Sequence, residues 1–133
     1  MRLRPLAVAA LAVVLLAGCG SSDGASADTA TRSFQADNGT IEIPADPQRV
    51  VATGYAVPAL IEADAKLVGV SSWQRGIPLM TPEDLATYNE LTKIAGETAA
   101  ETNYEAIAAA KPDLIVIGVP KPVLADIDLD RLK

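Results

Sequence analysis

The residue whose chemistry the sequence indicates most directly is its one cysteine. Cys19 follows Leu16 and the small residues Ala17 and Gly18, which close an apolar run that begins after Arg2 and Arg4. A charged start, a short hydrophobic stretch and small residues before a cleavage point are typical of a secretory signal peptide, here residues 1–18. A disulfide within the chain is impossible, and the position of the cysteine favours thioether lipidation over redox or metal chemistry. The alternative is an ordinary secretory signal with an incidental cysteine. We therefore predict a lipoprotein, anchored by acyl chains such as palmitate to the extracytoplasmic face of the cell membrane.

A second chemical signal comes from two aromatic residues and an arginine. Tyr55 lies in the loop 53–56, and Trp73 and Arg75 lie in the loop 71–76, in a chain with one tryptophan and three tyrosines. Flat rings beside a bidentate guanidinium suit a large ligand that has carbonyl-rich or aromatic parts and negative charge. The alternative is that the rings cover the edge of the core and that the guanidinium is an ordinary solvated charge. We predict Tyr55, Trp73 and Arg75 as ligand-binding residues.

Metal chemistry has few candidate ligands in this sequence. The chain has no histidine, and its single cysteine is the predicted lipidation site. Asp126, Asp128 and Asp130 have the spacing that opens a calcium-binding loop, but Arg131 stands where the turn needs glycine. A solvated, acidic helix start explains these residues better. The sequence therefore predicts no cofactor and no direct metal site, so any iron would arrive inside a chelator.

Catalytic machinery and a nucleic-acid partner are both disfavoured. The sequence has no phosphate-binding glycine loop, no nucleophilic serine turn and no histidine base, and Glu97 and Glu101 have no recognisable partner. A formal net charge of −6 repels the phosphate backbone of nucleic acids. We therefore expect a binding protein with no catalytic residues.

The elements that must position these residues follow from the apolar pattern. Residues 19–36 are small and polar and predict a flexible tether, and residues 37–133 predict one α/β domain. Apolar runs predict strands at 40–43, 49–53, 67–71 and 113–117, while proline and capping residues predict helices at 58–65, 82–88 and 104–110. This alternation is typical of a three-layer fold with a mostly parallel sheet and flanking helices. Ligands gather at the carboxyl ends of such strands, where the loops that hold the aromatic residues begin.

Three segments carry a resemblance to a known family. They are the stretches 43–51, 67–71 and 103–115, the last with an asparagine-capped helix that leads into Lys-Pro-Asp-Leu-Ile. Residues 38–133 resemble the N-terminal lobe of the substrate-binding lipoproteins of ABC importers for ferric siderophores and cobalamin, which are two-lobe proteins joined by a long helix. One departure is the stretch 63–65, Ala-Asp-Ala, where the family often has a leucine-glycine helix end.

The resemblance implies delivery rather than catalysis. Such a protein captures a ferric siderophore or a similar chelate and hands it to an ABC permease in the membrane. Glu105 matches the family's glutamate that docks on permease arginines, although an acid there also stabilises the start of its own helix. The sequence stops at Lys133 inside a helix-like pattern, before the second lobe, so we expect a truncated chain. A stand-alone single-lobe adaptor lipoprotein and a secreted α/β enzyme are the alternatives.

Overall fold

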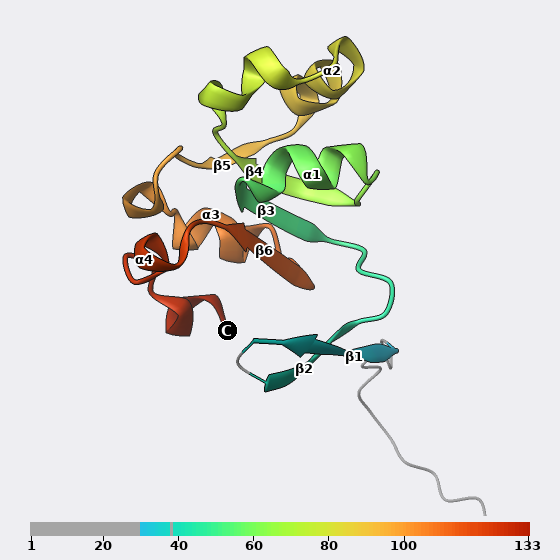
Figure 1. Ribbon diagram of the computed structural model, residues 1–133, viewed down its shortest axis with the longest axis vertical. Coiled ribbons are helices and arrows are strands. Elements are labelled where there is room, and N and C mark those ends of the chain that lie inside the picture. The colour runs from blue at the N-terminus through green and yellow to red at the C-terminus, as the bar shows by residue number, and fades with distance from the viewer. Residues whose placement is uncertain (1–29, 38) are drawn as a thin grey trace, which may run out of the picture.

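A computed structural model describes residues 30–37 and 39–133 (Figure 1). The predicted signal peptide, Cys19 and the first part of the predicted tether lie outside the described residues. The strands are β1 (Thr31–Ala36), β2 (Gly39–Pro44), β3 (Val50–Gly54), β4 (Leu67–Ser71), β5 (Lys93–Ala95) and β6 (Leu114–Gly118). The helices are α1 (Ala56–Glu62), α2 (Pro82–Glu90), α3 (Tyr104–Ala109) and α4 (Lys121–Leu124), with 3-10 turns at Gln74–Leu79, Ala99–Glu101 and Leu129–Leu132.

Four strands form a parallel sheet in the order β5-β4-β3-β6. Three of these strands coincide with the apolar runs predicted from the sequence. The fourth, β5, was not predicted, because it is three residues long and only Ile94 in it is buried. The central strand β3 pairs with β4 on one side and β6 on the other, so its carboxyl end lies between two loops.

Helices cover both faces of this sheet (Figure 1). Side chains of a strand alternate between faces, and β3 shows this at Val51 and Ala52, which are both fully buried. Ala52 packs in a cluster with Val57 of α1 and Tyr88 of α2, and Val51 packs in a second cluster with residues of β5 and α3. The predicted three-layer α/β fold with a parallel sheet is therefore confirmed.

Two helices begin as the sequence predicted. The Thr81 side chain accepts a hydrogen bond from the backbone N–H of Asp84 at the start of α2, and the Asn103 side chain accepts one from Ala106 at the start of α3. Each side chain satisfies a backbone N–H that has no partner within its helix.

Helix α1 ends earlier than residue 65, where the sequence predicted its end. Its last residue is Glu62, and Asp64 then adopts a left-handed backbone with φ of 51°. The N–H of Asp64 bonds to Ile61 O and the N–H of Ala65 to Leu60 O, which is the Schellman pattern of a helix end. An aspartate thus occupies the position that glycine usually fills.

The prediction of a tether as far as residue 36 was wrong for Thr31–Ala36. These residues form β1, which pairs with β2 as a separate antiparallel hairpin. The side chains of β1 are mostly exposed, so its composition resembles that of a linker. Polar contacts between the strands join the pair, including Thr40 Oγ1 donating to Gln35 Oε1 at 2.9 Å. Ile41, in the predicted strand 40–43, is an exposed hydrophobic residue of β2.

Across residues 30–37 and 39–133, no helix combines the length and the apolar character that crossing a membrane requires.

Candidate functional site

The candidate site forms where β3, β4 and β6 end. The N–H of Tyr55 donates to Gly118 O at 2.7 Å, and the N–H of Gly54 donates to Ser71 Oγ at 2.9 Å. Gly54 has φ of 57°, and a Cβ there would lie 2.3 Å from Gly118 O. Glycine is therefore required at position 54 for the loops after β3 and β6 to approach each other.

The three residues predicted to bind a ligand are brought together at this edge. The rings of Tyr55 and Trp73 meet edge to face, with centroids 4.6 Å apart and an interplanar angle of 67°. The Arg75 Cζ lies 5.4 Å from the centroid of the Trp73 ring. Tyr55 is 56% exposed, whereas Trp73 is only 5% exposed. Tyr55 therefore offers a broad contact surface, and Trp73 forms a wall of the site with a small accessible edge.

An unpredicted carboxylate orients the arginine. Arg75 Nε donates to Glu97 Oε1 at 2.7 Å, and the Arg75 backbone N–H donates to the same oxygen at 3.2 Å. The hydrogen bond from Arg75 lowers the pKa of the Glu97 carboxyl below its ordinary value, and the same hydrogen bond raises the pKa of Arg75. The partners lie 22 residues apart, and the unpredicted strand β5, which pairs with β4, leads the chain to Glu97 beside the loop after β4.

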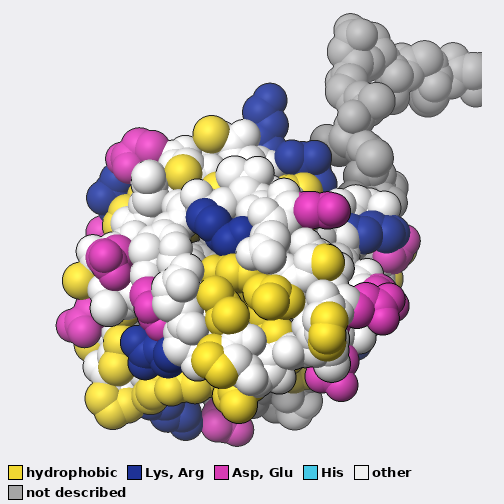
Figure 2. All heavy atoms as spheres, turned by 90° about the horizontal axis from the view of Figure 1, so that it is seen from above, with side chains coloured by type: hydrophobic (Ala, Val, Ile, Leu, Met, Phe, Trp, Pro, Cys, Tyr) yellow, Lys and Arg dark blue, Asp and Glu magenta, His cyan; other side chains and the backbone are white. Residues whose placement is uncertain are grey.

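Two cavities lie against these three residues. One, of about 250 Å³, is lined by the loops that follow the strands, including Gly54, Gly118 and Glu97. The other, of about 370 Å³, lies between α1, the turn Gln74–Leu79 and the start of α2. Figure 2 views the molecule from the α2 end of Figure 1 and shows apolar side chains gathered in the middle of this face, with charged side chains around them. Tyr55, Trp73 and Arg75 line both cavities.

Glu105 lies on the exposed first turn of α3, as the sequence predicted. Its side chain is 80% exposed and forms an ion pair with Arg131, whose Nη2 lies 2.7 Å from Glu105 Oε1. The Arg131 guanidinium also stacks on the ring of Tyr104 at 4.1 Å. Glu105 is thus accessible to a partner, which would have to replace or share the contact with Arg131.

Among the described residues, no group of three or more histidine, cysteine, aspartate or glutamate side chains could hold a metal ion. The turn Leu129–Leu132 lies beside the three aspartates that have calcium-loop spacing, Asp126, Asp128 and Asp130. Asp128 accepts a hydrogen bond from the N–H of Asp130 there.

No family model matches the chain. Two curated proteins that bind iron chelates or siderophores by name are similar to it in sequence. The chain is 30% identical over 113 residues to the iron(3+)-hydroxamate-binding protein YxeB of Bacillus subtilis, covering 85% of this chain and 30% of that protein. It is 37% identical over 115 residues to the probable siderophore-binding lipoprotein YfiY of the same organism, covering 80% of this chain and 34% of that protein.

Two solved structures are similar to this chain in both sequence and fold. The siderophore periplasmic binding protein from the fuscachelin gene cluster of Thermobifida fusca is 38% identical, with a TM-score of 0.51 over 59% of this chain and 28% of that one. The structure of holo-ViuP is 25% identical, with a TM-score of 0.53 over 76% of this chain and 33% of that one.

The chain is therefore homologous to siderophore-binding lipoproteins and periplasmic binding proteins, and it spans about a third of the length of the curated relatives that it matches. These relatives are named as binding proteins, which agrees with the expectation of binding rather than catalysis.

Proposed function

We propose that this protein binds a ferric siderophore or a similar chelate as the substrate-binding component of an ABC importer. The observation that supports this most strongly is the meeting of Tyr55, Trp73 and Arg75 at the carboxyl edge of a parallel sheet, in a chain homologous to siderophore-binding proteins. Lipidation at Cys19 would hold the protein on the membrane beside the permease.

The geometry suggests how each residue would contribute. Tyr55 and the accessible edge of Trp73 would contact the flat or apolar parts of the chelate. Arg75 would donate to the chelate's anionic oxygens, with Glu97 limiting the number of orientations that its guanidinium can adopt. Iron would remain inside the chelate, since the sequence offers no histidine and only one cysteine.

Glu105 would serve the second step, which is delivery. Its exposed carboxylate lies on α3, outside the residues that line the two cavities beside Tyr55. A basic surface of the permease would replace Arg131 as the ion-pair partner of this carboxylate. Ligand binding and docking would then depend on separate residues.

Tryptophan fluorescence tests the binding step, because Trp73 is the only tryptophan. Ferric hydroxamate, catecholate and carboxylate chelates, cobalamin and haem would be titrated into the purified protein. We expect saturable quenching by at least one ferric chelate, with a Kd of roughly tens to hundreds of micromolar for a site open on one side. The variant Arg75→Gln should weaken binding about tenfold, whereas Arg32→Gln, on the hairpin, should bind normally. If none of these compounds changes the fluorescence or the melting temperature, the proposed function is wrong.

A further inference from the structure

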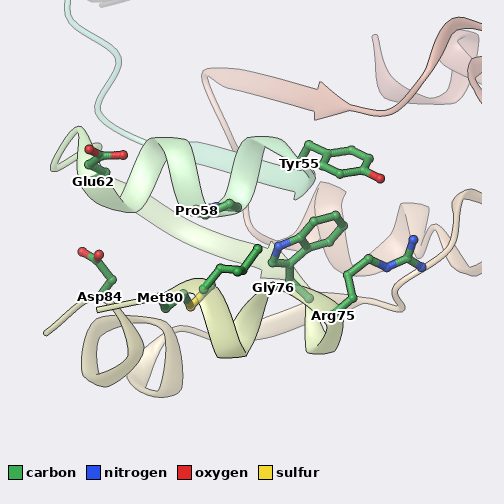
Figure 3. A pocket seen from close by; sticks show the side chains of 9 residues that line it. Tyr55, Pro58, Glu62, Arg75, Gly76, Met80 and Asp84 are labelled. Atoms are coloured by element: carbon green, nitrogen blue, oxygen red, sulfur yellow. The ribbon is translucent and has the colours of Figure 1, made fainter. Parts of the chain in front are cut away.

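The cavity of about 370 Å³ extends from Tyr55 along α1 to the start of α2, and we call it the α1–α2 groove. Tyr55, Pro58 and Glu62 follow a spacing of three and four residues, so they form one stripe along α1. The labelled side chains in Figure 3 show Tyr55 and Arg75 at one end of this groove, Pro58 and Met80 in its middle and Glu62 and Asp84 at the other end. The remaining lining residues are Trp73, Gly76 and Leu79.

The groove contains a hydrogen-bond donor that has no partner among residues 30–37 and 39–133. The Trp73 backbone N–H donates to the Tyr88 hydroxyl at 2.8 Å. The indole Nε1–H has no acceptor in the described part of the chain, and no buried side-chain nitrogen there lacks a partner, so Nε1 is reached by solvent. A Cβ at Gly76 would lie 1.8 Å from this Nε1, so the indole packs directly on the turn Gln74–Leu79. An indole nitrogen can only donate. Because Trp73 lines the groove, this N–H can donate to an acceptor that enters there.

The two ends of the groove carry opposite charge. Glu62 and Asp84 form no ion pair with any described residue. One oxygen of Asp84 accepts from Thr81 Oγ1 at 2.7 Å, which leaves its other oxygen for a ligand. Arg75 stands at the opposite end, beside the proposed chelate site. The space between the ends is lined by apolar groups, so a ligand that fits has a cationic end and an aliphatic stem.

We propose that the α1–α2 groove binds an aliphatic arm that carries an amide carbonyl and ends in a primary ammonium group. The ammonium would lie between Glu62 and Asp84, the methylene groups would pack on Pro58 and Met80, and the carbonyl would accept from Trp73 Nε1–H. The assignment of this arm to a ferric chelate rests on the proposed function, but the groove itself can be tested without iron.

The test is a nuclear magnetic resonance titration of the purified protein with N-(5-aminopentyl)acetamide. A single tryptophan gives a single indole N–H resonance, which reports directly on Trp73. We expect this resonance to shift saturably, with a Kd in the millimolar range. N-pentylacetamide, which lacks the amine, should bind about fivefold more weakly, because it loses partly exposed ionic contacts with two carboxylates.

Two double variants distinguish an ionic contact inside the groove from a general effect of the protein's negative charge. In Glu62→Gln with Asp84→Asn, the difference between the two compounds should fall below about twofold. In Glu83→Gln with Glu90→Gln, which removes the same charge from α2 residues outside the groove lining, the fivefold difference should remain.

The inference is overturned if neither compound shifts the indole resonance, or if both bind the unsubstituted protein equally well. If the amine binds as expected while no ferric chelate binds, the groove inference stands and the proposed function fails. If a ferric chelate binds while the amine does not, the proposed function stands and the groove inference fails.

Discussion

At the scale of single residues, the contact between Arg75 and Glu97 determines how the candidate site presents its positive charge. Glu97 accepts from both the backbone and the side chain of Arg75, so it fixes the loop and the guanidinium together. The sequence predicted that Tyr55, Trp73 and Arg75 would meet, because loops at the ends of adjacent parallel strands share one edge. It did not predict Glu97, because this residue lies beyond a strand too short to show an apolar pattern.

The Arg75–Glu97 contact should make stability depend on pH. The pKa of Glu97 is lower in the folded protein than its ordinary value of 4.5. Its contribution to stability is therefore fully present above that value and is lost as the pH falls through the lowered folded pKa. We expect Glu97→Gln to melt at a lower temperature than the unsubstituted protein at pH 7. At pH 3 the difference should be smaller, as thermal unfolding followed by circular dichroism would show. An equal difference at both pH values would mean that the carboxylate charge does not stabilise the fold.

A substitution at Glu105 should show that delivery to the permease and ligand binding depend on different residues. In cells that depend on this protein for uptake of a ferric chelate, Glu105→Ala should reduce uptake while the purified variant binds the chelate normally. Asp126→Ala removes another exposed carboxylate and should leave both unchanged. Equal losses of uptake and affinity in Glu105→Ala would place this residue in the ligand site instead.

At the scale of elements, short-range signals predicted the fold where side chains are buried or cap a helix. The apolar runs predicted the three longer strands of the sheet, and the capping residues Thr81 and Asn103 predicted where two helices begin. The hairpin strand β1 was missed because strands of exposed residues are held mainly by backbone pairing, which leaves little trace in composition. The α1–α2 groove was missed because it depends on how two helices and a 3-10 turn pack together.

The end of α1 offers a test of local strain. Asp64 holds a left-handed conformation that costs an ordinary residue about 1–2 kcal/mol and costs glycine almost nothing. We expect Asp64→Gly to raise the free energy of unfolding by up to about 1 kcal/mol and Asp64→Ala to lower it. Urea denaturation of the three proteins would measure both changes. A glycine variant less stable than the alanine variant would contradict this account of the helix end.

At the scale of the whole molecule, the proposed function combines two parts, a membrane anchor and a ligand site on an α/β lobe. The homology covers the lobe, and the anchor remains a prediction from residues 1–19. We expect the purified native protein to carry a lipid mass on Cys19 and to partition into detergent. Cys19→Ser should appear as an unprocessed precursor or as released protein. A soluble wild-type product without its signal peptide and without lipid would show that the anchor prediction is wrong.

The most direct test of the central claim is equilibrium dialysis of the purified protein against iron-labelled chelates of the hydroxamate, catecholate and carboxylate classes. The account predicts that at least one chelate is retained at one equivalent per protein, with iron and chelator retained together. The double variant Tyr55→Ala with Arg75→Gln should reduce retention about tenfold or more, while Phe34→Ala with Arg32→Gln, on the hairpin, should not. Failure to retain any of these chelates, or retention that is unchanged when Tyr55 and Arg75 are replaced, would contradict it.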